Sequence, residues 1–164
     1  MLRRSVVLAA ALATLAAASA AQAAAPVRYT DEFQFSDTID CSQFDTAWQF
    51  NDDFTDFFTV RGQLTLDAAG DPVSAIEHIV HRSNDVNSVT GLTIHEHNHF
   101  TAKFDFVRNT VTLSGAINIA QRRALGSVIH TTGHKVVDLM TGEPIVIKGP
   151  EQADDEDFCR AVAP

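Results

Sequence analysis

The sequence lacks the short motifs that position catalytic and phosphate-binding groups in many enzyme families. It has no Gly-x-Ser-x-Gly segment of the kind that carries a hydrolase nucleophile, and no glycine-rich phosphate loop. Its acidic segments 51–53 and 154–157 do not have the residue spacing of an EF-hand calcium loop. Sequence motifs therefore name no reaction and predict no cofactor, and we assign no catalytic residue.

Long apolar runs are absent except at the N-terminus. Arg3 and Arg4 precede an unbroken run of apolar and small residues at 5–20, and small-x-small patterns follow before Pro26. This order is typical of a secretory signal peptide, with an uncleaved membrane anchor as the alternative. No later stretch approaches the roughly 18 apolar residues that span a membrane. We therefore expect a cleaved signal at 1–25, one secreted domain at 26–164, and no membrane insertion after cleavage.

Positive charge is scarce. Loss of Arg3 and Arg4 with the signal would reduce the 12 basic residues to 10, against 21 acidic ones, which gives a net charge of −11. An acidic surface repels nucleic-acid phosphates and anionic lipid headgroups. We therefore expect no nucleic acid and no membrane surface among the partners.

Cysteine is also scarce. The only two, Cys41 and Cys159, follow the predicted signal, and an even number of cysteines in an oxidising compartment predicts an internal disulfide. The alternatives are two free thiols or a bridge between chains. An internal bridge would close most of the mature chain into one loop, which stabilises the fold by about 4–5 kcal/mol in the chain-entropy model.

Helical periodicity is missing, and period-two alternation takes its place. Strands are predicted at 27–35, 44–50, 54–66, 73–82, 92–107, 111–119, 127–139 and 143–148. We expect an all-β fold, a single antiparallel up-and-down barrel of about eight strands resembling a lipocalin barrel, with a β-sandwich as the alternative. Closure is favoured because it removes exposed strand edges. It would also bring Cys41 and Cys159 near the seam between the first and last strands.

Several positions resemble those of a group of small exported bacterial proteins. The shared features are Cys41, Thr90-Gly91-Leu92 before a long strand, a Gly133-x-x-Val136-Val137-Asp138 segment, Gly142, and Phe158-Cys159 near the end. Those proteins are largely uncharacterised and are generally described as lipocalin-like or allene-oxide-cyclase-like barrels. The resemblance spans most of the mature chain. It implies a barrel and export, and it implies no activity.

Three histidines alternate with polar residues in one predicted strand. His95, His97 and His99 lie on the same side, and alternate strand residues can bind a metal ion. His95 and His99 would be about 13 Å apart, too far to share an ion. We therefore assign the candidate surface metal site to His95 and His97, with His78 or His81 as a neighbour. The favoured interpretation is nevertheless a solvated stripe, because the other residues on this side are polar.

The opposite side of the same strand combines apolar residues with Glu96 and Asn98. Polar side chains within an apolar face are costly unless they form hydrogen bonds or contact a ligand. Asp56 lies on the apolar side of its own strand, whereas the buried side of 73–82 is ambiguous. We therefore expect a small apolar or amphipathic ligand in the barrel interior, bound by Glu96, Asn98, Asp56, Trp48, Phe58 and Phe104.

Three alternatives stay open beside this expectation. The first is an isomerase or cyclase that uses the same pocket, with Glu96 as its acid or base. The second is a metal-binding protein that uses the surface histidines. The third is a structural protein with a filled barrel, since both pocket-based functions need an interior cavity of at least about 300 Å³.

Overall fold

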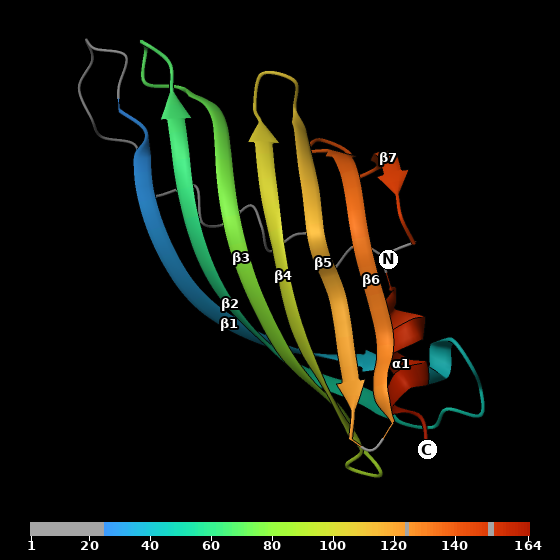
Figure 1. Ribbon diagram of the computed structural model, residues 1–164. Helices are drawn as coiled ribbons and strands as arrows, with labels where there is room; N and C mark the ends of the chain where they lie inside the picture. The colour runs from blue at the N-terminus through green and yellow to red at the C-terminus, as the bar shows by residue number, and fades with distance from the viewer. Residues whose placement is uncertain (1–24, 124, 151–152) are drawn as a thin grey trace.

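The computed structural model describes residues 25–123, 125–150 and 153–164, and one antiparallel sheet dominates it. Its seven strands are β1 (Val27–Asp40), β2 (Asn51–Leu66), β3 (Pro72–Asn87), β4 (Thr93–Asp105), β5 (Thr110–Arg122), β6 (Gly126–Asp138) and β7 (Pro144–Lys148). They lie in chain order across the sheet (Figure 1). A 3-10 helix, η2 (Cys41–Gln43), follows β1, and α1 (Asp155–Val162) lies near the C-terminus.

The all-β prediction is confirmed, but the predicted closure into a barrel is wrong. β1 pairs with β2 and β7 pairs with β6, and among the described residues the first and last strands do not pair with each other. The sheet instead bends into a trough with α1 on its concave side (Figure 1). β7 aligns with only four residues of β6, so the last strand offers little edge for pairing with β1. The sandwich alternative is also wrong, because the described strands form a single sheet.

The described sheet has seven strands rather than eight, because the predicted strand at 44–50 consists of turns and loop. The Asp40 side chain accepts hydrogen bonds from the backbone and the hydroxyl of Ser42. The backbone N–H of Ala47 donates to the Asp45 side chain. These local hydrogen bonds favour a turn, whereas a strand would need partners from a neighbouring strand.

The sequence pattern does not predict α1. Asp154 and Asp157 form a capping box at its N-terminus, and acidic side chains in its first turn stabilise the positive end of the helix dipole. Phe158, Cys159 and Val162 are its buried residues. A helix of eight residues is too short to show a clear helical period in the sequence.

Two apolar clusters occupy the concave face, one at each end of the trough. The helix-side cluster is Ile39, Cys41, Phe50, Phe54, Ile94, Ala120, Ile129, Phe158, Cys159 and Val162. The open-side cluster is Val60, Leu64, Ala75, Ile79, Ala102, Phe104 and Val111, and none of the described helix residues packs against it. All cluster members on β2 and β4 have even numbers, as the alternation predicts.

The disulfide between Cys41 and Cys159 is present, as expected, and both cysteines are fully buried. It joins η2, at the end of β1, to α1 rather than to the last strand. It therefore fixes the C-terminal helix against the end of the first strand at the helix side of the trough, where no described strand joins the two ends of the sheet.

We expect the Cys41→Ala/Cys159→Ala variant to lose about 4–5 kcal/mol of unfolding free energy, because the bridge closes a loop with a sequence separation of 118. Urea unfolding of the variant and the oxidised wild type, followed by circular dichroism, measures the difference. A difference below about 1 kcal/mol would show that the disulfide does not constrain the unfolded chain as the chain-entropy account requires.

Candidate functional site

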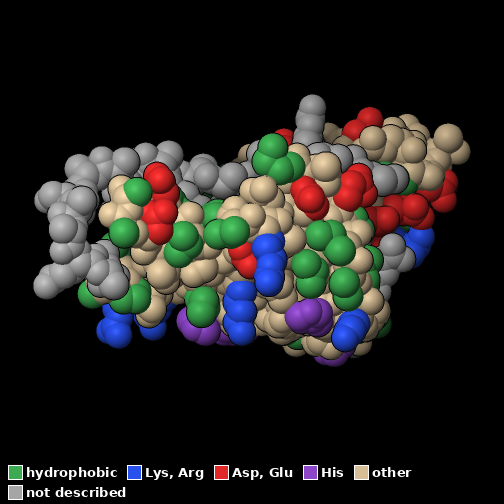
Figure 2. Space-filling view, turned by 90° about the horizontal axis from the view of Figure 1, so that it is seen from above, with side chains coloured by type: hydrophobic (Ala, Val, Ile, Leu, Met, Phe, Trp, Pro, Cys, Tyr) green, Lys and Arg blue, Asp and Glu red, His purple; other side chains and the backbone are tan. Residues whose placement is uncertain are grey.

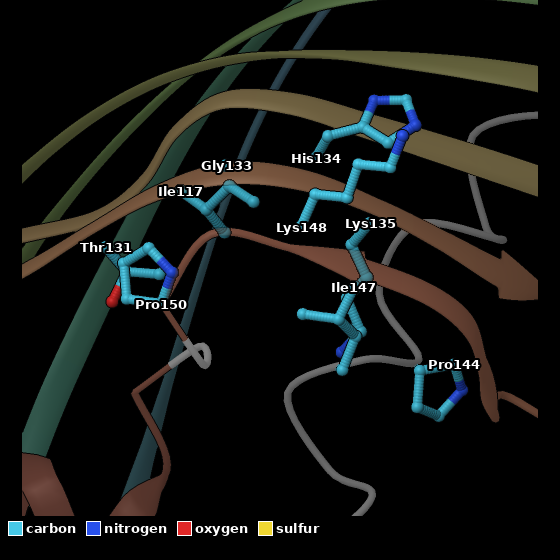
Figure 3. A pocket seen from close by; sticks show the side chains of 9 residues that line it. All are labelled: Ile117, Thr131, Gly133, His134, Lys135, Pro144, Ile147, Lys148 and Pro150. Atoms are coloured by element: carbon cyan, nitrogen blue, oxygen red, sulfur yellow. The ribbon is translucent and has the colours of Figure 1, made fainter.

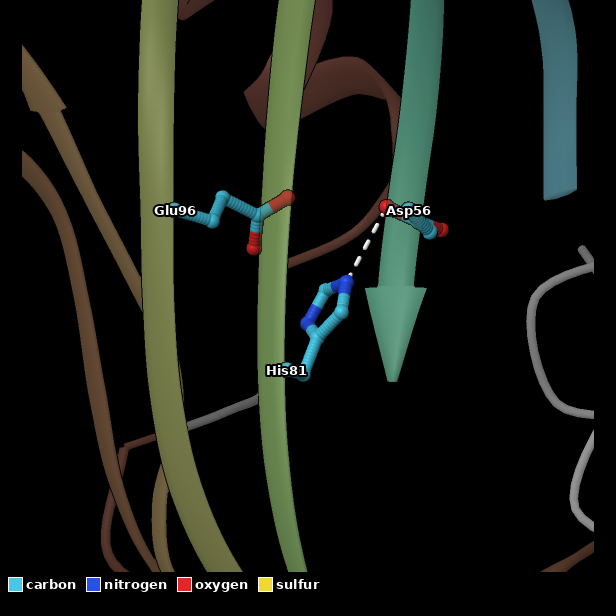
Figure 4. Close-up of side chains that lie close together, drawn as sticks. All are labelled: Asp56, His81 and Glu96. Atoms are coloured by element: carbon cyan, nitrogen blue, oxygen red, sulfur yellow. Dashed lines mark hydrogen bonds and ion pairs between the residues drawn. The ribbon is translucent and has the colours of Figure 1, made fainter. Parts of the chain in front are cut away.

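Three neighbouring strands place polar side chains together on the concave face between the two apolar clusters. These are Asp56 on β2, His81 on β3, and Glu96 and Asn98 on β4, which we call the interior network (Figure 4 shows three of them). In the strand register Ser83 lies opposite both Asp56 and Glu96, and His81 lies opposite Asn98. All four residues of the network are buried.

The network is held by hydrogen bonds. His81 Nε2 lies 3.0 Å from Asp56 Oδ1, and Asn98 Nδ2 lies 2.9 Å from His81 Nδ1. The same Asn98 nitrogen lies 3.1 Å from Glu96 Oε2. Asn98 Oδ1 accepts a hydrogen bond of 2.6 Å from the backbone N–H of Ile119.

The Ile119 hydrogen bond defines the protonation of the imidazole. Because a backbone N–H only donates, the amide of Asn98 must place its oxygen toward Ile119 and its nitrogen toward His81. His81 Nδ1 is therefore an acceptor, and its Nε2 carries the proton that Asp56 accepts. This N–H is available because the β4–β5 register shifts between Glu96 and His99.

Asp56, His81 and Glu96 also have the donor atoms of a metal site, with one such atom from each residue within 4.8 Å of the others. The hydrogen bonds compete with that use. A metal on His81 Nε2 would move the ring proton to Nδ1, where it would face the N–H donors of Asn98. The described geometry therefore fits a hydrogen-bonded network better than a metal centre. Proton transfer at His81 would require either Asp56 or Asn98 to move, because both ring nitrogens already form hydrogen bonds.

Aromatic rings continue the network along the trough. Phe58 stacks on His81 with ring centroids 4.4 Å apart, and Phe33 stacks on Phe58 at 4.9 Å. Phe35 lies 6.2 Å from Phe58. Phe58, a predicted ligand residue, therefore lies beside the network, because Phe58 and His81 are direct partners in the β2–β3 register.

The predicted ligand residues do not all lie together. Trp48 precedes β2 and packs against the helix-side cluster. Phe104 belongs to the open-side cluster and stacks on Phe106 at 5.8 Å. The structure therefore groups Asp56, Phe58 and Glu96 with Asn98 and separates Trp48 and Phe104 from them, because alternation shows the side of a sheet but not the position along it.

The alternation of residues 73–82 leaves the side of His81 open and does not single out Glu77. His81 and Glu77 have odd numbers, as do the buried residues Ala75 and Ile79 of the same strand, and this indicates that both face the trough. Glu77 is buried, and its carboxyl accepts a hydrogen bond from the Tyr29 hydroxyl. Burial raises the pKa of Glu77, and the Tyr29 hydrogen bond opposes that rise. Burial, with Glu77 nearby, also raises the pKa of Tyr29.

The histidines of β4 are exposed, as predicted, and each of them contacts another polar side chain. His95 Nδ1 lies 2.7 Å from Asn84 Oδ1, whereas the Nε2 atoms of His97 and His99 lie 2.9 Å apart. The two ring nitrogens that lie close together on this strand therefore belong to His97 and His99, rather than to His95 and His97, the predicted metal ligands. The other candidate neighbour, His78, is also exposed and lies 3.2 Å from the Thr101 hydroxyl.

Two hollows lie away from the interior network. The first, of 140 Å³, lies beside β5, β6 and β7 and is lined by Ile117, Lys135 and Ile147 among others (Figure 3). The second, of 410 Å³, lies between β6 and α1 and is lined by His130 and Arg160 among others. Neither is lined by a residue of the interior network, so neither is the predicted interior cavity.

Comparison of the chain with protein-family models, curated proteins and solved structures found no match. The resemblance to exported barrel proteins thus stays a prediction. In the described part of the chain, no helix combines the length and the apolar character needed to cross a membrane. Residues 1–24 of the predicted signal lie outside the described residues.

We expect Asn98→Asp to lower the unfolding free energy by about 2–3 kcal/mol, because it replaces a buried donor to His81 and Glu96 with an acceptor. Chemical denaturation measures this loss. Asn84→Asp is the matched control, since Asn84 is exposed and its oxygen still faces His95, and a change within about 0.5 kcal/mol is expected there. Equal effects of the two variants would contradict the buried network.

We expect Glu77→Gln to remove a pH dependence of stability. The pKa of Glu77 is raised in the folded protein, so folding favours its protonated form, and stability is lost as the pH rises from the ordinary value of 4.5 through the raised value. Unfolding midpoints measured from pH 4 to pH 8 should fall less steeply in the variant. Glu32→Gln, at an exposed position of β1, is the control, and identical profiles for wild type and Glu77→Gln would refute the assignment.

Proposed function

We propose that this protein is exported and binds a small amphipathic ligand on the concave face of its sheet. The observation that carries the proposal is the row of rings from Phe33 through Phe58 to His81, which joins partly exposed aromatic surface to the buried interior network. A ligand lying on these rings would place its apolar body on Phe33 and Phe58 and turn its polar group toward Glu96 and Asn98.

The open side of the trough supplies apolar surface for such a ligand. Partly buried hydrophobic side chains surround the open-side cluster, among them Tyr29, Phe33, Phe58, Phe100 and Leu113. Seen from this end, hydrophobic side chains reach the surface between charged ones (Figure 2). The proposed surface is thus the open face of the trough rather than an enclosed cavity.

The chemistry of the network favours one kind of polar group on the ligand. Asp56 and Glu96 present carboxyl oxygens, which accept hydrogen bonds when ionised. The chain is also acidic overall, with a formal net charge of −9. A hydroxyl or amine group therefore fits this surface better than a carboxylate or a phosphate does.

Export is supported by two features. The N-terminal sequence has the pattern of a signal peptide, and the disulfide between Cys41 and Cys159 belongs to an oxidising compartment. Native mass spectrometry of the protein purified from the medium of its own cells tests both halves of the proposal. The expected result is a chain that begins near Pro26 and retains a lipid-sized mass, whereas a full-length chain with no retained mass would oppose it.

We expect Phe58→Ala to weaken binding of dansylcadaverine, a fluorescent amine with an aromatic body, by at least about tenfold, because a stacked ring is lost. A fluorescence titration measures the affinity. Phe57→Ala is the matched control, since Phe57 is 41% exposed and alternates with the trough-facing residues. The idea fails if the wild type does not bind the probe, or if both variants bind it equally.

A further inference from the structure

The convex face of the sheet carries histidines that the proposed function does not use. On β3 and β4, His78, His95, His97 and His99 are exposed and alternate with residues that face the trough. Figure 2 shows histidine and basic side chains along one edge of the molecule. Only one pair of these four rings, His97 and His99, is joined by a contact between ring nitrogens.

The rings of His97 and His99 converge. Two residues of extended strand rise about 6.8 Å, yet the two ring centroids are only 4.5 Å apart and the two Nε2 atoms only 2.9 Å apart. Both side chains therefore lean toward each other. The convergence lies where the β4–β5 register shifts, between Glu96 and His99.

The separation of the two nitrogens matches that of two ligands on one metal ion. Metal–imidazole bonds are about 2.0–2.1 Å long, so two nitrogens at right angles around an ion lie about 2.9 Å apart. Right-angled nitrogen ligands are typical of the square-planar or tetragonal geometry of Cu²⁺ and Ni²⁺. The pair thus has the spacing of such a chelate before any ion binds.

We propose that His97 and His99 form a chelating site for a divalent transition-metal ion on the convex face, with Cu²⁺ as the ion bound most tightly. Cu²⁺ is the strongest binder among the first-row divalent ions at nitrogen sites. The proposal does not rest on the ligand-binding function, because the two sites lie on opposite faces of the same strand.

The surroundings of the pair define an open site. Arg82 lies opposite His97, and Val80 and Ala116 lie opposite His99. Among the described residues, no other His, Cys, Asp or Glu completes a group of three donors with this pair. The other coordination positions are therefore left to water or to a molecule from solution.

The neutral pair of His97 and His99 can bind an ion without releasing a proton. In the neutral pair one Nε2–H donates to the other Nε2. Coordination by both Nε2 atoms places the single proton of each neutral ring on Nδ1, so the pair releases no net proton. Desolvation, followed by the electrostatic effects of His99 and Arg82, lowers the pKa of His97.

Titration of the full-length folded protein with CuCl₂, followed by calorimetry and electron paramagnetic resonance, tests the site. We expect one high-affinity Cu²⁺ per chain with nitrogen hyperfine structure. His97→Gln and His99→Gln should each weaken Cu²⁺ binding at least about tenfold. Each variant keeps only one of the two histidine ligands, so the second metal–nitrogen bond can no longer form within the same site.

His95→Gln is the matched control, since His95 lies on the same strand and face but contacts Asn84. It should change the affinity less than about twofold, and metal-free melting temperatures should show that all three variants are folded. Equal weakening by all three substitutions would show loose binding along the stripe and would overturn the proposal. Unchanged binding in His97→Gln and His99→Gln would place the copper elsewhere and would also overturn it.

Discussion

The register shift between β4 and β5 is the constraint on which the interior network depends. It leaves the backbone N–H of Ile119 to the side chain of Asn98, and this one hydrogen bond fixes the direction of the Asn98 amide. The amide in turn fixes the tautomer of His81. On the other face of the same strand, the shift coincides with the convergence of His97 and His99. A regular ladder would have paired Ile119 with β4 and left Asn98 without this donor.

The open trough follows from how the sheet ends. β7 is short and aligns with four residues of β6, so it offers little edge with which β1 could pair, and among the described residues the two strands do not pair. At the helix side, α1 and the disulfide provide the contact between the two ends of the chain that strand pairing would provide in a barrel. At the open side no described helix covers the concave face, and its aromatic rings stay partly exposed. An open sheet therefore leaves apolar surface partly exposed on its concave face, whereas a closed barrel would enclose that surface.

Alternation in the sequence located the faces of β2 and β4 correctly. Glu96 and Asn98 lie inside, and His97 and His99 lie outside, because the side-chain period of a strand is two whatever the strand pairs with. Alternation leaves the side of His81 open, since β3 mixes apolar and polar residues on both sides. It could not separate Phe104 from Phe58 either, because distance along the trough depends on how neighbouring strands align.

By itself, the sequence determined the all-β class, the sidedness of β2 and β4 and the single pairing open to two cysteines, because these depend on local periodicity and on a count. The tertiary structure decided that the sheet stays open, that the acidic segment before Cys159 is a helix, and that Asp56, His81 and Glu96 meet. Each of these depends on strand register, strand length or packing between distant segments. Such contacts are made by residues far apart in the chain, and no local pattern specifies them.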